Sequence, residues 1–387
     1  MTIATSPRRL LVISAVMAAL VLAGCGDGED RPRVDVIEDS GSASGSSGSV
    51  SASGPVSSLP AASPSGAEYA TASNVDAYFA VGLDLRDIRA VMAPASQGQP
   101  VDWAQATAIY QEGKNQTRAD GTVRSLASIP NDDVQKMFAN GASVYGRPNF
   151  IDAMIRDGLN GTGRGQGLSD DSRRQIVDKG IQMLMYGKAL QELSAARTRI
   201  EQKNLDNNSG APHAVDEAWG VIAGAPDNNG ARPHALLQTA TSRESNFKLE
   251  GKIRQPIEAA FVAAQKAAQA GDLAAFDKTH GEIKGYLNSI FYLASLRYAK
   301  TLEGDTEATA RETHLAEGWA FSQTIRATVA SGSASAAKTV EDTYNRSATG
   351  AFSASITAAI YSALNESAVI QALGIPAALV VTTPPAQ

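Results

Sequence analysis

The chain of 387 residues contains a single cysteine, Cys25, so it can form neither an internal disulfide nor a metal site built from several thiolates. It also lacks an excess of positive charge, because 34 Lys and Arg stand against 40 Asp and Glu, a formal net charge of −6. A dedicated nucleic-acid-binding protein needs clustered cations that replace the counterions of the phosphates. This balance therefore excludes nucleic acid as a partner. Hydrophobic residues make up 43% of the chain, which is enough for one large or two moderate domains.

The apolar run near the N-terminus is too short to cross a membrane as a helix. Residues 10–22 are apolar except for Ser14, and Arg8 and Arg9 precede them. A positive start followed by a short apolar stretch is typical of a signal peptide, and a spanning helix needs about 20 such residues. Residues 1–24 are therefore predicted to be a signal peptide.

The run Leu22-Ala23-Gly24-Cys25 that follows resembles a bacterial lipobox, in which the cysteine thiol is acylated and becomes the new N-terminus. The alternative is an ordinary secretory signal with an incidental cysteine. We expect a lipoprotein acylated at Cys25 and held in the cell envelope by its lipid. Gly26 at the next position favours transfer to the outer membrane in a Gram-negative cell.

Three further regions follow Cys25. Residues 25–68 are rich in Ser, Gly, Ala and Pro and lack aromatic side chains, which is typical of a flexible tether. Residues 69–375 are expected to form the helical domain, and residues 376–387 a C-terminal tail.

Helical periodicity runs through the body of the chain. Ile176, Met183 and Leu190 recur every seven residues, which predicts a helix over 170–203, and a similar pattern predicts another over 273–302. Shorter helices are expected over 84–92, 101–113, 132–139, 149–158, 252–270, 307–329, 335–347 and 355–373. Residues 379–381 are the only β-like run, so the sequence predicts an all-α protein of packed helical bundles.

Two segments about a hundred residues apart carry a similar pattern of a histidine, an acid and a tryptophan. The first contains His213, Asp216, Glu217 and Trp219, and the second contains His314, Glu317 and Trp319. The pattern predicts a fold of two pseudo-repeated halves. The residue two positions after each Glu lies about 200° round a helix, so each Trp is expected to point into the core and away from its Glu.

Residues three or four apart share one face of a helix. His213 therefore lies beside Asp216 and Glu217, and His314 beside Glu317. An imidazole with carboxylates suits iron, manganese or zinc, and the lack of a usable thiolate argues against a soft metal. We predict Glu217 and Glu317 as the carboxylates that matter most for iron, with Glu192 as a further carboxylate and Tyr292 or Tyr298 as a phenolate donor. The alternative is that these acids lie at solvated helix starts, where they offset the helix dipole.

Other chemistry finds little support in the sequence. There is no His-Glu-x-x-His pair, and the glycine-rich residues 161–167 match neither a dinucleotide-binding nor a P-loop spacing. Residues 206–217 imitate a calcium loop only in part, because Ala211 replaces the glycine needed at position six. Arg124 and Arg243 could hold an anion, although structural roles fit them as well.

Several runs appear in a colinear order between Tyr78 and Ile325, namely 103–115, 120–126, 149–163, 189–193, 211–219, 243–247 and 316–321. In residue type and order they resemble the Fe-assimilating, or low-iron-inducible periplasmic, protein family known from algae. The resemblance implies an extracytoplasmic protein that serves iron acquisition and is not an enzyme. The chain departs from the family pattern at Gly220-Val221, where an aromatic pair such as Ala320-Phe321 is expected.

Two functions remain open. The first is a tethered iron-binding protein that captures the metal and passes it to a transporter. The second is a metal-free helical scaffold or binding module that resembles the imelysin-like proteins, whose His-x-x-Glu motif is matched by His314 and Glu317.

Overall fold

The computed structural model describes residues 69–118, 120–228 and 230–384. Within them the all-α prediction is confirmed, because the chain forms the helices α1 to α15 and four short 3-10 helices, and no strand. The run at 379–381 begins in the 3-10 helix Ala377–Leu379 and forms no strand. The predicted signal peptide, the acylation of Cys25 and the tether lie outside the described residues.

The two long helices predicted from the sequence are the longest elements of the structure. Helix α7 spans Asp170–Glu201 and helix α11 spans Leu273–Gly304. The Ser169 hydroxyl accepts a hydrogen bond from the backbone N–H of Ser172, and two aspartates occupy the first turn of α7, where their charge is favourable against the helix dipole.

The other helices include most of the predicted ranges. They are α1 (Asp76–Phe79), α2 (Val81–Met92), α3 (Trp103–Glu112), α4 (Asp132–Gln135), α5 (Gly141–Tyr145), α6 (Phe150–Asn160), α8 (Ala211–Ala223), α9 (Leu236–Phe247), α10 (Arg254–Ala270), α12 (Ala308–Gly332), α13 (Ala334–Tyr344), α14 (Ala354–Leu364) and α15 (Ser367–Leu373). Helices α1, α5 and α9 lie outside the predicted ranges, and α4 ends at Gln135 instead of residue 139. The segment predicted as one helix over 355–373 is divided into α14 and α15. Asn365 separates them, and its side chain accepts from the Tyr292 hydroxyl at 2.9 Å and donates to the Val381 carbonyl at 3.0 Å.

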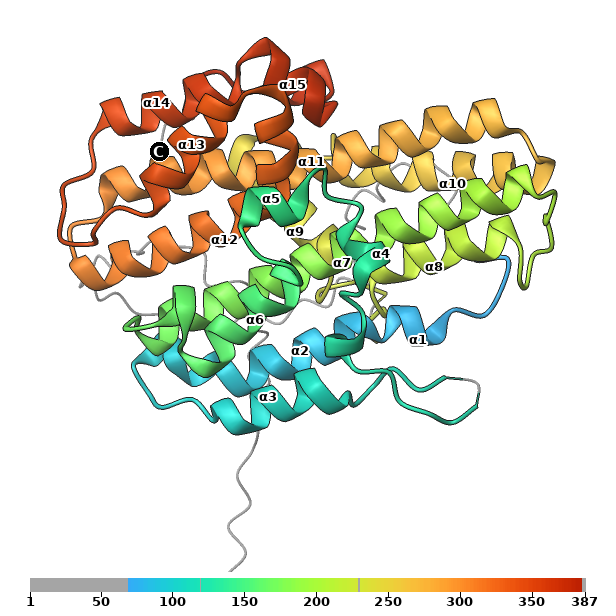
Figure 1. Cartoon of the computed structure of the whole chain (residues 1–387), viewed down its shortest axis with the longest axis horizontal. Helices are drawn as coiled ribbons and strands as arrows, with labels where there is room; N and C mark the ends of the chain where they lie inside the picture. The colour runs from blue at the N-terminus through green and yellow to red at the C-terminus, as the bar shows by residue number, and fades with distance from the viewer. Residues whose placement is uncertain (1–68, 119, 229, 385–387) are drawn as a thin grey trace, which may run out of the picture. The chain divides into compact units, whose positions relative to one another are not determined.

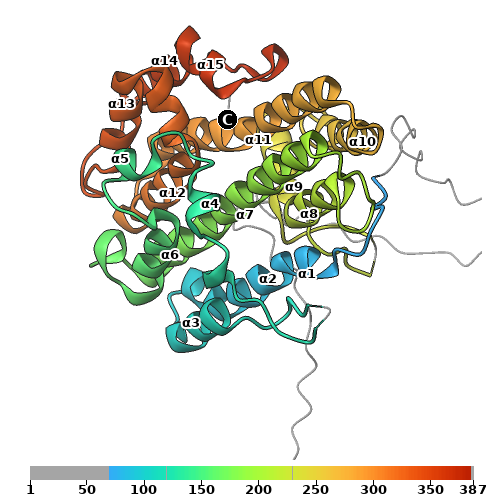
Figure 2. The same cartoon turned by 45° about the vertical axis from the view of Figure 1, so that its right-hand side comes forward.

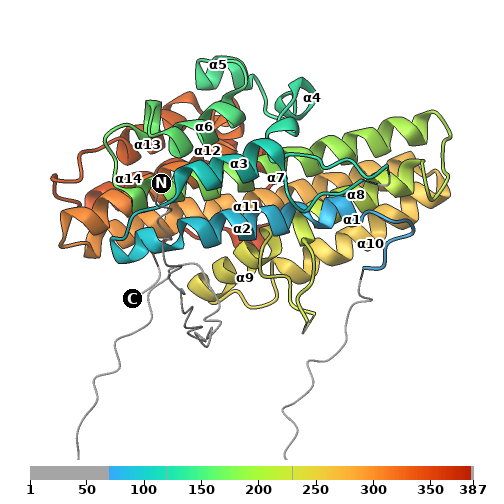
Figure 3. The same ribbon diagram turned by 90° about the horizontal axis from the view of Figure 1, so that it is seen from below.

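Helix α7 lies at the centre of this arrangement and packs against α6, α8 and α12 (Figure 1). Helix α8 packs against both α7 and α10 (Figure 2). Helices α1 and α2 follow one another across these helices, with α1 against α8 and α2 against α7 (Figure 3). As a result, segments from the start and the middle of the chain meet at the first turns of α8.

Both tryptophans of the repeated pattern are buried, as their spacing predicts. Trp219 is 2% exposed, and its ring centroid lies 4.8 Å from that of Tyr69 and 5.3 Å from that of Phe261. Trp319 is 8% exposed and donates its indole N–H to Glu341. The division into two pseudo-repeated halves stays a prediction. Within the described ranges, none of the helices combines the length and the apolar character that crossing a membrane requires.

Candidate functional site

Two carboxyl groups predicted from the sequence meet where α8 packs on α7. Glu217 lies in the second turn of α8, which begins at Ala211 with Pro212 in its first turn, a position where a missing N–H costs nothing. Glu192 faces it from α7, close enough for the two carboxyl groups to repel each other when both are ionised. Both residues are almost completely buried, at 8% and 4% exposure. Because two buried like charges are unfavourable, one of the two carboxyl groups favours its protonated form.

Burial and the neighbouring charge explain where this proton resides. Desolvation, and then the repulsion from Glu192, raises the pKa of Glu217 to about 7. Glu217 is therefore the partner that carries a proton below about pH 7.

Lys188 and Tyr78 complete the surroundings of this pair. The Lys188 ammonium, one turn before Glu192 on α7, forms an ion pair with it. The hydroxyl of Tyr78 on α1 donates to Glu192 at 3.4 Å. Burial, and then the charges of the two glutamates, raises the pKa of Tyr78, so its phenol is neutral. The Arg124 guanidinium lies 4.3 Å from the centroid of the Tyr78 ring. We call Tyr78, Lys188, Glu192, His213 and Glu217 the dicarboxylate cluster.

His213 joins the cluster from the first turn of α8. Its Nε2 lies 3.2 Å from Oε1 of Glu217, one turn later on the same helix, as the spacing predicts. Its Nδ1 lies 2.8 Å from the Ser73 hydroxyl. Desolvation, and then the nearby Arg199, lowers the pKa of His213, so the imidazole is neutral near pH 7. A neutral imidazole is the form that binds metals.

Asp216, three residues after His213 on α8, is fully buried and faces the chain segment before α1. It accepts hydrogen bonds from the Tyr69 hydroxyl at 2.5 Å, the Gln265 amide at 2.7 Å, the Ala72 N–H at 2.8 Å, and the Ser73 N–H and hydroxyl at 2.9 and 2.8 Å. Because these donors surround both oxygens, Asp216 fastens the chain segment before α1 and has little capacity left for a metal.

The second His and Glu pair has different partners. Glu317 on α12 forms an ion pair with the buried Lys179 of α7, with 3.1 Å between Nζ and Oε1. The Lys179 ammonium also lies 3.2 Å from Asp178. His314 directs its Nδ1 at Asp305, 2.8 Å away, at the end of α11. Glu317 is therefore neutralised by a lysine, whereas Glu217 faces another carboxyl group.

The two tyrosines predicted as phenolate donors are both buried on α11. The Tyr292 hydroxyl donates to Asn365 and accepts from the N–H of Val381 at 3.1 Å, and burial raises its pKa to about 12. The Tyr298 ring is stacked on Phe321 with 5.8 Å between the centroids, and it lies 5.9 Å from the ring of His314. Tyr292 thus holds the C-terminal segment, and Tyr298 packs beside the second His.

Of the residues predicted as iron ligands, the structure brings together Glu192, Glu217 and His213. Sequence reasoning missed Tyr78 and Lys188. Lys188 lies one helical turn from Glu192, so the periodicity of α7 could have indicated it, but the four residues of α1 carry no periodic signal for Tyr78. In the described ranges, no group of three or more His, Cys, Asp or Glu side chains is arranged so that it could hold a metal ion as it stands.

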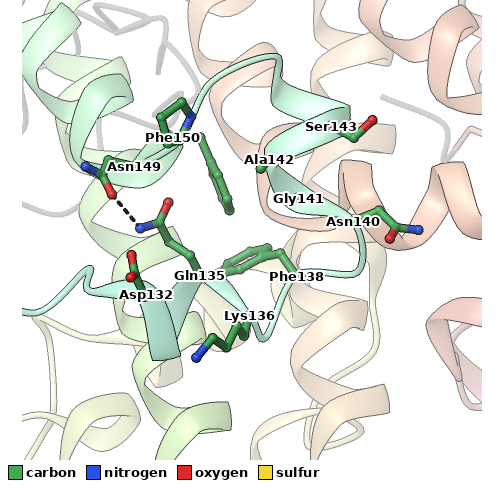
Figure 4. A pocket seen from close by; sticks show the side chains of 11 residues that line it. Asp132, Gln135, Lys136, Phe138, Asn140, Gly141, Ala142, Ser143, Asn149 and Phe150 are labelled. Carbon is green, nitrogen blue, oxygen red and sulfur yellow. Dashed lines mark hydrogen bonds between the residues drawn. The ribbon is translucent and has the colours of Figure 1, made fainter.

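A separate open cavity of about 600 Å³ lies between α4, α5 and the start of α6 (Figure 4). The Gln135 amide donates to Asn149 across it at 2.9 Å, and Phe138 and Phe150 lie on its apolar side. Its lining residues include none of the predicted ligands, and Asp132 and Lys136 are its only charged residues. The cavity therefore offers no iron chemistry.

The chain was compared with protein families, curated proteins and solved structures. The family described as low iron-inducible periplasmic protein matches residues 48–314, which is more than half of the chain and includes every residue of the dicarboxylate cluster. No curated protein and no solved structure matches. The chain therefore belongs to the low iron-inducible periplasmic protein family, which indicates an iron-related role and is consistent with the resemblance in the sequence.

Proposed function

We propose that this member of the low iron-inducible periplasmic protein family is an iron-binding protein of the cell envelope, and not an enzyme. It takes up iron as cargo at the dicarboxylate cluster and passes it to a transporter. Acylation of Cys25 holds it at the membrane, and residues 25–68 act as the tether. The family supports the iron-related role, and the lipobox-like run supports the anchor.

One observation carries the choice of site, namely the two buried and mutually repelling carboxyl groups of Glu192 and Glu217 with the Nε2 of His213 beside them. Burying two carboxyl groups against each other is unfavourable, because one of them must stay protonated or gain a cation. Two carboxylate oxygens and one imidazole nitrogen suit iron, and the neutral Tyr78 phenol lies within reach as a fourth donor.

Lys188 explains how the cluster exists without a metal. Its ammonium neutralises Glu192, and the raised pKa of Glu217 lets this second carboxyl group hold a proton and be neutral as well. Iron binding therefore requires the loss of this proton and the withdrawal of the ammonium, so that the carboxylates can close around the ion. Lys188 has a second partner on its own helix, because its Nζ donates to Gln191 at 2.7 Å. The ammonium can thus leave Glu192 without losing every hydrogen bond.

The test is calorimetry of the purified full-length protein with Fe²⁺ under anaerobic conditions and with ferric citrate, each with and without bicarbonate. The double variant Glu192→Gln/Glu217→Gln keeps the shape and hydrogen-bonding capacity of both side chains, so we expect it to fold. We expect it to bind iron at least about 100-fold more weakly, because both carboxylate ligands are lost and only the His213 imidazole remains.

Two control variants make this result specific. Glu201→Gln removes a carboxylate from the exposed end of α7 and should leave iron affinity unchanged. Glu317→Gln removes the second predicted carboxylate, which pairs with Lys179, and should lower stability without lowering iron affinity. Wild-type affinity in the folded double variant would refute this site. A wild-type protein that binds no iron under any of these conditions would favour the metal-free scaffold.

A further inference from the structure

The segment before α1 lies against the first turns of α8. Residues 69–75 run from Tyr69 to the start of α1. Tyr69, Ala72 and Ser73 of this segment all donate hydrogen bonds to Asp216. The Gln265 side chain on α10 donates to Asp216 and to the Ala70 carbonyl, which fixes the segment from the other side. We call residues 69–75 the N-terminal strap.

The direction of the hydrogen bonds around Ser73 follows from the number of hydrogens. A serine hydroxyl has one hydrogen to donate. Asp216 is surrounded by N–H and O–H donors and can only accept, so the Ser73 hydroxyl must donate its hydrogen to Oδ2, at 2.8 Å. The Ser73 oxygen therefore acts as the acceptor toward His213 Nδ1, also at 2.8 Å, and Nδ1 carries a hydrogen.

This assignment determines which nitrogen of His213 is available for a metal. In the neutral imidazole with a hydrogen on Nδ1, the lone pair is on Nε2. Nε2 is the nitrogen that faces Glu217, 3.2 Å from its Oε1. Metal-binding histidines usually donate their second nitrogen to a carboxylate or a carbonyl, and this hydrogen bond fixes the ring and its tautomer. Here the bond reaches the carboxylate of Asp216 through a serine hydroxyl.

We infer that Ser73 and Asp216 are positioning residues, which hold His213 as the Nδ1–H tautomer with the Nε2 lone pair directed at Glu217. The N-terminal strap then contributes to the proposed iron site, because its Ser73 orients the His213 ring, and it also packs against α8. The purpose of this arrangement rests on the proposed function, whereas the tautomer itself can be observed without iron.

The first measurement is the ¹⁵N NMR spectrum of the histidine rings in the iron-free protein, near neutral pH. The chain has four histidines, so the signals of His213 can be assigned by their loss in His213→Gln. We expect the Nδ1–H tautomer in the wild type, a mixture of tautomers in Ser73→Ala, and the Nδ1–H tautomer again in Ser73→Thr, which restores a hydroxyl.

The second measurement is iron affinity, with a control that loosens the strap without touching Ser73. We expect Ser73→Ala to bind iron about 10-fold more weakly, which is the effect of removing such an outer partner, and Ser73→Thr to bind nearly as the wild type does. Gln265→Ala removes another donor to Asp216 and should lower the melting temperature, but it should leave the His213 tautomer unchanged.

The outcomes separate the two proposals. An Nε2–H tautomer in the wild type overturns the positioning role, whether or not the protein binds iron. Unchanged tautomer and iron affinity in folded Ser73→Ala overturn it as well. If the wild type shows the Nδ1–H tautomer, lost in Ser73→Ala, but binds no iron, the positioning role stands and the proposed function fails.

Discussion

Glu217 and Glu317 are the same kind of residue in similar sequence contexts, yet their surroundings give them different chemistry. Each lies two residues before a buried tryptophan and packs against α7. Glu217 meets a carboxyl group of α7, and Glu317 meets an ammonium group. The sequence placed both acids beside a histidine, but the charge of the residue that each acid faces depends on which position of α7 that acid contacts. The periodicity of a single helix does not reveal which residues of another helix it will contact.

The raised pKa of Glu217 predicts how stability changes with pH in the iron-free protein. Its pKa is about 7 in the folded state, above the ordinary value of 4.5, so the folded state holds the proton more tightly than the unfolded state does. The contribution to stability is thus fully present below about pH 4.5 and is lost as the pH rises through 7. Each pKa unit corresponds to about 1.4 kcal/mol, which limits the loss to about 3 kcal/mol.

The variant Glu217→Gln has no proton to lose and should not show this loss. Urea unfolding at pH 4.5 and pH 8 should therefore show that the stability of Glu217→Gln relative to the wild type increases by up to about 3 kcal/mol at the higher pH. Glu201→Gln, at an exposed site, serves as the control for the change in charge. A difference between Glu217→Gln and the wild type that stays constant with pH would contradict the raised pKa.

At the scale of the helices, the sequence predicted best where an apolar face is long. The ranges of α7 and α11 agree with the predictions to within three residues, because many buried positions recur at helical spacing. Helices α1 and α5 have four and five residues, too few for a period to appear. The break between α14 and α15 depends on the hydrogen bonds that Asn365 accepts from Tyr292 and donates to Val381, two residues that are distant in the sequence.

The buried tryptophans allow a test of the packing between helices. Trp219 lies against Tyr69 of the strap and Phe261 of α10. Replacing a buried tryptophan by alanine removes a large apolar surface and leaves a cavity, which costs about 3–5 kcal/mol. We expect such losses for Trp219→Ala and Trp319→Ala in urea unfolding. Trp103→Ala should cost less, because Trp103 is only partly buried. Equal losses for all three would show that burial does not determine their contributions.

For the whole molecule, the central hypothesis outside the described residues is the lipid anchor. If Cys25 is acylated, Cys25→Ser should release the protein from membranes or leave the signal peptide uncleaved, because the thiol that accepts the lipid is absent. Cell fractionation and the mass of the mature protein measure both effects. Normal cleavage together with unchanged retention in the membrane fraction would rule out a lipoprotein. Ser14→Ala, inside the apolar run, is a control that should change neither.

The proton on Glu217 would make the proposed iron site an ion exchanger. If the cargo is Fe²⁺, it would take the place of one proton and of the Lys188 ammonium at the carboxylates, so loading would exchange positive charge for positive charge and leave little uncompensated charge inside the protein. A local supply of protons where the protein meets its acceptor would then favour discharge, after which the lysine and the proton on Glu217 would restore the empty state.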